Sequence, residues 1–278
     1  MEAILPVKAL PADSSCQKDF KIITTIRSDG LLENPPTTTS LPPGFKPSRF
    51  YMPQLHRDRM LAAVEAFNWP QNPTEVISNL EGFLSAHLKY KYKDSHYTSP
   101  LKLRVTVFHG GAINVTSTPM PAVELGSLFP NSFLGLLTQR PSFNIFVSPV
   151  STSPSLFTSH KTTKRAQYDE IRALLPNSSE KPDGKAAPLL AEILLVNHNG
   201  EIMEGSITTP YFLREGEWIT PSAKCGGNLG TTRRYALGQG ICKESIVMKE
   251  SVQVGERVVL SNSVRGFGWG FVEELEKP

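Results

Sequence analysis

Cysteine is scarce in this chain of 278 residues, which has three: Cys16, Cys225 and Cys242. Three thiols at such wide spacing cannot build a disulfide framework, and they lack the paired spacing of a zinc site. A protein with so few cysteines fits a reducing compartment. We therefore expect a cytoplasmic protein without a metal site.

Long apolar runs are also missing. No stretch approaches the roughly 18 consecutive apolar residues of a transmembrane helix. Residues 1–20 lack both the apolar core of a signal peptide and the arginines of a transit peptide. These absences predict that the protein has no membrane partner, and they again favour the cytoplasm.

Charge of one sign is not in large excess. The chain has 29 basic and 26 acidic residues, a formal charge of +3, and no dense basic run. Such a balance predicts no nucleic-acid partner. A small anionic substrate remains compatible with this composition.

What is present is an ordinary globular composition, with 39% hydrophobic and 20% charged residues. The length is sufficient for two domains. We predict a small N-terminal domain over residues 1–121 and a larger C-terminal domain over residues 141–278. Residues 122–140 show turn signals without a clear period, which predicts a connection between the domains.

Residue patterns predict α+β structure in the first domain. β-branched residues indicate a strand over residues 20–27, and apolar positions at helical spacing indicate helices over residues 53–67 and 74–88. Residues 101–109 and 112–118 alternate on either side of a Gly-Gly pair. This arrangement predicts a β-hairpin.

The second domain is predicted to be α+β as well. The predicted strands span residues 143–147, 189–197, 201–213 and 257–261, and the predicted helices span residues 163–175 and 231–244. Asn199-Gly200 is the preferred dipeptide of a type I′ hairpin turn. Pro210 has no N–H for a sheet ladder, which predicts an edge or a bulge in its strand.

Four features carry chemistry, although each has an ordinary explanation when taken alone. The glycine-rich loop over residues 226–233 precedes a predicted helix, where backbone N–H groups suit an anion, but glycines there often make only a turn. Lys161 lies between a predicted strand and a predicted helix, where most lysines are solvated. Glu204 in a strand and Arg59 on a helix could equally face water.

The order of these features resembles the class-IV pyridoxal-phosphate enzymes, the group of branched-chain and D-amino-acid aminotransferases and aminodeoxychorismate lyases. The matching segments are residues 56–60 (HRDRM), 160–168 (HKTTKRAQY), 204–209 (EGSITT), 229–233 (LGTTR) and 261–266 (SNSVRG). Within the family the resemblance is strongest to fungal-type aminodeoxychorismate lyases. Residues 157–168 match their F-T-S-x-K-T-T-x-R-x-x-Y pattern.

This resemblance implies an α+β, two-domain enzyme of fold type IV, with its site in the cleft between the domains and a homodimeric assembly. The implied cofactor is pyridoxal 5′-phosphate. Lys161 would be the catalytic residue and bind it covalently, Glu204 would keep its pyridine nitrogen protonated, and Arg59 would bind its phosphate. The implied cofactor contacts are Arg59, Lys161, Glu204, Thr231, Thr232 and Ser263.

The lyase resemblance implies 4-amino-4-deoxychorismate as substrate and 4-aminobenzoate and pyruvate as products, a step of folate synthesis. Because that substrate carries two carboxylates, cations should face it. Arg27 and Arg265 are the candidates, together with Thr25. Structural ion pairs at strand ends would explain both arginines equally well.

Two other functions remain open. An aminotransferase would use the same cofactor with a keto acid as second substrate, and no residue excludes it. An inactive family member could serve as a binding protein, although it would have no physical need for Lys161, Glu204 and Arg59 together. Asn228-Leu229-Gly230 replaces the usual leucine-proline-glycine, which predicts a less rigid phosphate loop.

Overall fold

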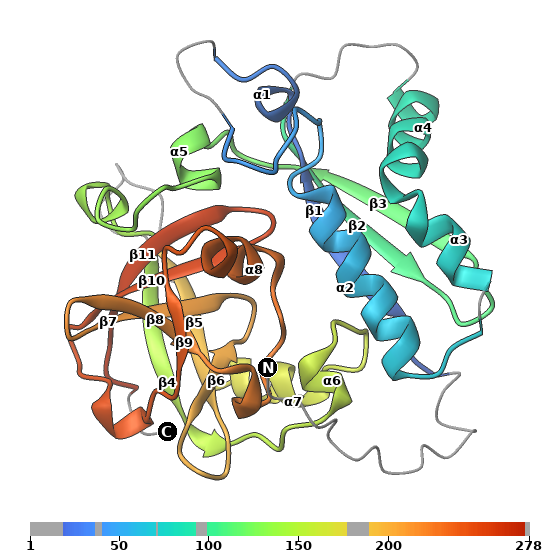
Figure 1. Cartoon of the computed structure of the whole chain (residues 1–278). Coiled ribbons are helices and arrows are strands. Elements are labelled where there is room, and N and C mark those ends of the chain that lie inside the picture. The colour runs from blue at the N-terminus through green and yellow to red at the C-terminus, as the bar shows by residue number, and fades with distance from the viewer. Residues whose placement is uncertain (1–18, 37–40, 71, 93–98, 177–188, 276–278) are drawn as a thin grey trace, which may run out of the picture.

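Two β-sheets organise the computed structural model, which describes residues 19–36, 41–70, 72–92, 99–176 and 189–275 (Figure 1). The smaller sheet has the order β1-β2-β3, with β1 (Ile22–Ser28), β2 (Leu101–Val107) and β3 (Ile113–Pro119). The larger sheet has eight strands in the order β6-β5-β4-β11-β10-β7-β8-β9. This mixture of helices and strands confirms the predicted α+β class.

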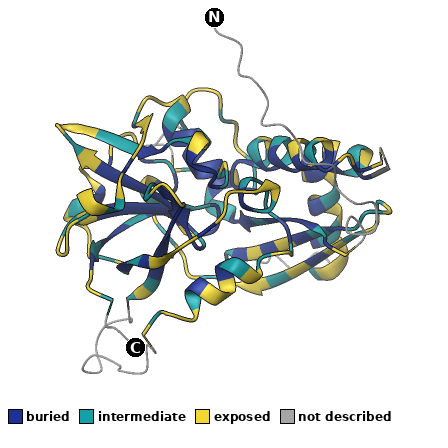
Figure 2. Cartoon of the chain, turned by 90° about the horizontal axis from the view of Figure 1, so that it is seen from below, coloured by how far each residue is buried: buried dark blue, intermediate teal, exposed yellow. Residues whose placement is uncertain are grey.

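The smaller sheet buries one face against helices. β2 alternates buried and more exposed positions, and its buried side chains join those of α2 (Pro53–Ala66), α3 (Asn72–Ser78) and α4 (Leu80–Tyr92) in one core. Figure 2 shows the buried colour on the sides of the helices that face this sheet. The helix predicted over residues 74–88 is two helices that meet at Asn79, a residue type that competes with the helix backbone for hydrogen bonds.

Both predicted hairpins exist. β2 and β3 pair antiparallel around Gly111, whose φ of +89° only glycine adopts readily. β5 and β6 pair antiparallel around Asn199-Gly200, but the predicted type I′ turn is wrong. Gly200 has a φ of +78°, whereas Asn199 is not among the residues with positive φ. A type I′ turn needs positive φ at both central positions.

The larger sheet is mixed. Its parallel pairs are β11 with β4, β4 with β5, and β8 with β9, and its other pairs are antiparallel. The strands are β4 (Phe143–Ser151), β5 (Leu190–Val196), β6 (Ile202–Gly205), β7 (Thr209–Arg214), β8 (Glu217–Pro221), β9 (Lys243–Ser245), β10 (Arg257–Asn262) and β11 (Gly266–Val272). The prediction that the strand at residues 257–261 is the last is wrong. Three glycines in β11 concealed that strand, because glycine has low β-propensity.

The single strand predicted over residues 201–213 is two strands. β6 pairs with β5, whereas β7 pairs with β10 on the far side of the sheet. The edge or bulge predicted from Pro210 is also wrong, since β7 lies between β10 and β8 and pairs with both in a regular register. The Pro210 carbonyl accepts the Thr220 hydroxyl at 2.9 Å in place of a ladder bond.

Two predicted helices are shorter than expected. α7 covers Ala166–Arg172 and follows α6 (Leu156–Ser159), because Thr162 and Thr163 pair with the edge of β1 instead. α8 covers Thr231–Gly238 rather than residues 231–244. Gly240, with a φ of +67°, follows that helix, and the chain then enters β9.

Residues 122–140, which were predicted to connect the two domains, contribute side chains to a buried core. They include α5 (Leu125–Leu128) and a 3₁₀ turn (Leu136–Thr138), and Phe133 is fully buried in an aromatic core with Tyr211 and Phe267. α1 (Gly30–Glu33) contributes Leu32 to the same core. In the described residues no helix is long and apolar enough to cross a membrane. The same residues contain no cluster of three or more metal ligands.

Candidate functional site

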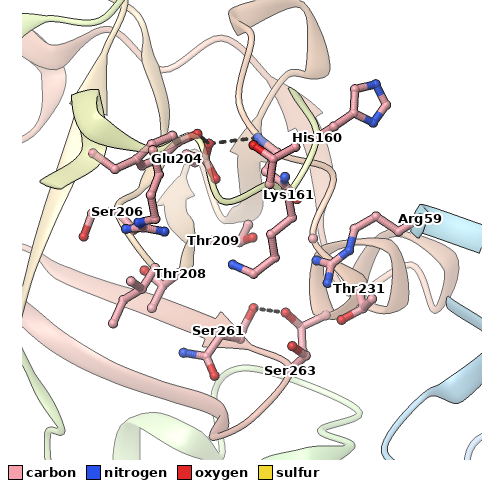
Figure 3. A pocket seen from close by; sticks show the side chains of 18 of the residues that line it. Arg59, His160, Lys161, Glu204, Ser206, Thr208, Thr209, Thr231, Ser261 and Ser263 are labelled. Atoms are coloured by element: carbon pink, nitrogen blue, oxygen red, sulfur yellow. Dashed lines mark hydrogen bonds between the residues drawn. The ribbon is translucent and has the colours of Figure 1, made fainter. Parts of the chain in front are cut away.

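A polar pocket lies where α2, the Lys161 segment and the larger sheet meet. Its lining includes Arg59 from α2, the chain around Lys161, the segment after β6, the loop before α8, and the end of β10. Figure 3 shows Lys161 pointing between Glu204 and the groups around Thr231 and Ser261. Five segments that are distant in sequence therefore converge on one cavity.

Lys161 is held by its backbone on the edge of β1. Its carbonyl accepts the N–H of Ile23 at 3.0 Å, and Thr163 donates to the carbonyl of Lys21 at 2.9 Å. Burial, followed by the positive charges of Arg59 and Arg165, lowers the pKa of Lys161 to about 7. Near neutral pH a large share of this amine is therefore unprotonated and can act as a nucleophile.

Glu204 is buried at the opposite end of the pocket. Its Oε1 accepts the Tyr168 hydroxyl at 2.6 Å and the backbone N–H of Asn228 at 3.0 Å. Burial raises the pKa of Glu204 to about 7, although both hydrogen bonds act to lower it. No hydrogen bond to Oε2 is found within the described ranges, which leaves that oxygen for a ligand.

Arg59 and the start of α8 form the third part of the pocket. Arg59 is buried, donates from Nη2 to the Thr24 hydroxyl at 2.7 Å, and has no partner at Nε among the described residues. The backbone N–H of Arg234 donates to the Gly230 carbonyl at 3.0 Å, which is the first hydrogen bond of the helix. The backbone N–H groups of Thr231, Thr232 and Arg233 lie before this bond and point out of the helix N-terminus. Gly230 caps the helix without a side-chain bond. A cation beside free N–H groups at a helix N-terminus favours a bound anion.

The side chains of Thr232 and Ser263 are already engaged. Ser261 donates to Thr232 Oγ1 at 2.8 Å, and Ser263 donates to the Thr25 carbonyl at 2.7 Å. Thr231 Oγ1, by contrast, is buried without a partner in the described structure. Thr231 is therefore a better hydroxyl donor to an anion here than Ser263, which was predicted to take part.

The structure does not bring the three predicted substrate contacts to the pocket. Thr25, Arg27 and Arg265 are absent from its lining. Arg27 is fully buried, forms an ion pair with Asp29 at 2.6 Å, and donates to the Val264 and Pro121 carbonyls. Its prediction as a substrate contact is corrected to a structural ion pair, because its hydrogen-bonding groups are used internally.

The glycine-rich loop is more closely packed than its composition indicated. A Cβ on Gly227 would lie 2.5 Å from the Met203 carbonyl oxygen, and one on Gly226 would lie 2.4 Å from Pro154. The loop therefore runs directly beside β6. This close approach is what allows the N–H of Asn228 to reach Glu204.

Two site residues were not assigned from the sequence. Tyr168 lies within the matched lysine motif, but its contact with Glu204 depends on how α7 packs against the larger sheet. Glu192 on β5 is fully buried and accepts hydrogen bonds from Arg172, Ser206 and Thr208. It holds the turn that follows Glu204, and no motif pointed to it.

The pocket fits the cofactor that the sequence resemblance implies. An amine with a lowered pKa, a carboxylate with one open oxygen, and a cation beside a helix N-terminus are present together. Arg59 Nε and Thr231 Oγ1 are buried polar atoms that need a partner. A phosphate group would accept hydrogen bonds from both atoms. A protonated aromatic nitrogen would donate a hydrogen bond to the Glu204 carboxylate.

Sequence comparison identifies similar proteins. The family model described as "Amino-transferase class IV" matches residues 44–268. The chain is 30% identical over 185 residues to "Aminodeoxychorismate lyase" of Saccharomyces cerevisiae, a match covering 59% of this chain and 50% of that protein. It is 28% identical over 221 residues to "Putative aminodeoxychorismate lyase" of Schizosaccharomyces pombe, covering 78% and 81%. The chain thus spans about half the length of the first relative.

Comparison with solved structures shows the same fold. The "Putative amino-acid aminotransferase" of Mesorhizobium loti superimposes with a TM-score of 0.64 at 19% identity, covering 92% of this chain and 100% of that one. At this level of identity the likeness establishes the fold type and nothing about the substrate.

Proposed function

The chain belongs to the amino-transferase class IV family of pyridoxal-phosphate enzymes, and we propose that it is an aminodeoxychorismate lyase. The reaction would convert 4-amino-4-deoxychorismate into 4-aminobenzoate and pyruvate. The names of the two fungal relatives and the lysine motif at residues 157–168 support this choice. We further propose that the enzyme is a homodimer with its site between the two sheets.

One observation carries the proposal: Lys161, Glu204 and Arg59 converge on a single pocket from separate segments. Each has a different chemical task. Arg59 and the N–H groups of Thr231 and Thr232 would hold the phosphate, and Glu204 Oε2 would face the ring nitrogen. Lys161 Nζ would attach the cofactor.

When bound, pyridoxal phosphate withdraws electrons from the carbon that carries the substrate amino group. Glu204 would keep the ring nitrogen protonated, which would strengthen that withdrawal. Lys161 Nζ, released when the substrate amine takes its place, would accept the proton from the amino-bearing carbon. It would return a proton to the methylene carbon of the departing enolpyruvyl group, as the carbon–oxygen bond breaks, pyruvate leaves and the substrate ring becomes aromatic. The lowered pKa of Lys161, about 7, suits an amine that both accepts and donates a proton near neutral pH.

The substrate carboxylates need partners other than Arg27. Arg165 lines the pocket and reaches the Ser206 carbonyl at 3.4 Å, while its Nε binds Asp169 at 2.9 Å. Its exposed ion pair contributes little to stability, so Arg165 can turn toward an anion at small cost. We propose Arg165 as a substrate carboxylate contact.

The first experiment is an absorption spectrum of the purified protein before and after borohydride reduction, followed by peptide mapping. We expect a visible band that reduction bleaches and a pyridoxyl group on Lys161. Lys164→Ala is the matched control, because Lys164 is exposed and lies three positions along. The control should keep the adduct on Lys161, and an adduct on any other lysine would refute the assignment.

A second experiment addresses the substrate. The protein should release 4-aminobenzoate and pyruvate from aminodeoxychorismate, and Lys161→Ala should abolish this release. If amino acids instead yield keto acids while aminodeoxychorismate is untouched, the protein is an aminotransferase. If no cofactor binds, the protein is an inactive family member.

A further inference from the structure

A buried chain of polar contacts connects β1 to the arginine of the pocket. Thr24 Oγ1 lies 2.6 Å from His56 Nδ1 and 2.7 Å from Arg59 Nη2. Thr24 and His56 have no exposed surface, and Arg59 is 9% exposed. The three groups therefore interact without competition from water.

One hydrogen-bond direction in this chain is fixed by chemistry. A guanidinium only donates, so Thr24 Oγ1 accepts from Arg59 Nη2. Thr24 Oγ1 and His56 Nδ1 share a second hydrogen bond, whose direction depends on the imidazole tautomer. Burial, followed by the charges of Arg59 and Lys161, lowers the pKa of His56 well below its usual value, so the imidazole is neutral.

β1 also holds the lysine. Ile23 donates its N–H to the Lys161 carbonyl at 3.0 Å, and the next residue, Thr24, binds the Arg59 side chain. Two consecutive residues of one strand therefore position the two groups assigned to the aldehyde and to the phosphate of the cofactor. A strand is stiff, so the spacing between these two anchors is fixed before any ligand binds.

We propose that Thr24, supported by His56, is a positioning residue that orients Arg59 for the cofactor phosphate. This inference rests on the proposed role of Arg59. Thr24 occupies Nη2, which restricts rotation of the guanidinium and leaves its remaining N–H groups, including the unpartnered Nε, for an anion. A pre-oriented arginine binds phosphate more tightly than a mobile one, because less side-chain entropy is lost on binding.

The test measures affinity and requires no turnover. Apoprotein is titrated with pyridoxal phosphate and, separately, with inorganic phosphate, for the wild type, Thr24→Val and Thr24→Ser. Valine keeps the shape and removes the hydrogen bonds, so we expect affinity for both ligands to fall by about tenfold or more. Serine keeps the hydroxyl and should restore most of the affinity.

Thr106→Val is the matched control. Thr106 lies on β2 opposite Ile23, between two positions whose side chains face the helices, so its own side chain faces away from Arg59. This substitution removes a threonine hydroxyl from the same sheet and should leave both affinities within twofold of the wild type. Thermal unfolding of every variant reports whether the fold is kept.

A mutant cycle separates positioning from a purely structural role. If Thr24 acts through Arg59, Thr24→Val should have no further effect on phosphate affinity in an Arg59→Ala background. Equal losses in both backgrounds, or wild-type affinity in Thr24→Val, would overturn the inference. If Thr24→Val does not fold, His56→Leu takes its place in the cycle.

Failure of the proposed function has a different signature. Wild-type protein that binds cofactor but does not cleave aminodeoxychorismate leaves the positioning role intact. Wild-type protein that binds neither pyridoxal phosphate nor inorganic phosphate would refute both the cofactor role of the pocket and the positioning role.

Discussion

The hydroxyl of Tyr168 lies 2.6 Å from Oε1 of Glu204 and donates a hydrogen bond to it across the base of the pocket. The N–H of Asn228 donates to the same oxygen at 3.0 Å. Burial raises the pKa of Glu204, and these two bonds oppose the rise. The charge of Glu204 near neutral pH therefore depends on a tyrosine from α7 and a backbone group from the glycine-rich loop.

Replacing Tyr168 by phenylalanine removes one of these two donors. We expect the pKa of Glu204 to rise by about one unit, because a hydrogen bond to the ionised form is lost. The acidic limb of the pH profile of kcat/KM should move to higher pH by the same amount. Tyr90→Phe is the control, since Tyr90 is 85% exposed. An unchanged acidic limb in Tyr168→Phe would refute this account.

Arg165 is one of the charges that lower the pKa of Lys161. Arg165→Gln should raise that pKa by about half a unit to one unit, since a nearby like charge disfavours the protonated amine. Attachment of pyridoxal phosphate at pH 7 should then be slower, and the rate should recover at pH 8. Lys164→Gln makes the same charge change one residue away. An equal shift in both variants would contradict a specific effect of Arg165.

Periodic segments were predictable from the sequence. Strand alternation over residues 101–119 gave the hairpin correctly, because one face of that sheet is buried and the other is open. The break within residues 201–213 was not predictable. Ser206 and Thr208 turn the chain by binding Glu192, which lies on a strand that no local pattern connects to them.

The site residues also fall into those that the sequence predicted and those that it did not. The motifs identified Lys161, Glu204, Arg59 and Thr231, which the structure brings to one pocket. Arg27 was equally consistent with a substrate contact and with a structural ion pair, and its contact with Asp29, two residues away, supports the ion pair. Nearby opposite charge was a signal that Arg27 is internally paired. Glu192 and the Thr24–His56 contact lay beyond sequence reasoning, because each joins segments whose proximity depends on the fold.

Two glycines near the site should respond in opposite ways to alanine. A Cβ on Gly227 would meet the Met203 carbonyl oxygen at 2.5 Å, so the backbone beside Glu204 must move. A Cβ on Gly238, at the end of α8, meets nothing within 4 Å. We expect Gly227→Ala to lower the free energy of unfolding by about 2 kcal/mol or more and to weaken cofactor binding. Gly238→Ala should raise that free energy by up to about 1 kcal/mol. Urea unfolding checks both, and equal effects would contradict the packing argument.

The free energy of unfolding of the apoprotein should change with pH through two opposing contributions, one from buried histidines and one from Glu204. Burial lowers the pKa of His56 and of His160 in the folded protein from 6.5. As pH falls below 6.5, these histidines are therefore protonated in the unfolded chain before they are protonated in the folded one, and the free energy of unfolding decreases. The pKa of Glu204 is raised from 4.5 to about 7, so its contribution is full below pH 4.5 and is lost as pH rises through 7. Between pH 6.5 and 5 the two effects oppose each other.

Glu204→Gln removes the contribution of Glu204 and leaves that of the histidines. The apoprotein of this variant should therefore lose stability on acidification more steeply than the wild type, by roughly 1 kcal/mol for each pH unit between 6.5 and 5. Urea unfolding at pH 7, 6 and 5 measures this difference. Glu170→Gln, the same change at an exposed position of α7, is the control and should leave the shape of the wild-type curve unchanged. Parallel curves for Glu204→Gln and the wild type would show that Glu204 stays ionised in the folded apoprotein, and the pocket would then carry a fixed negative charge before the cofactor arrives.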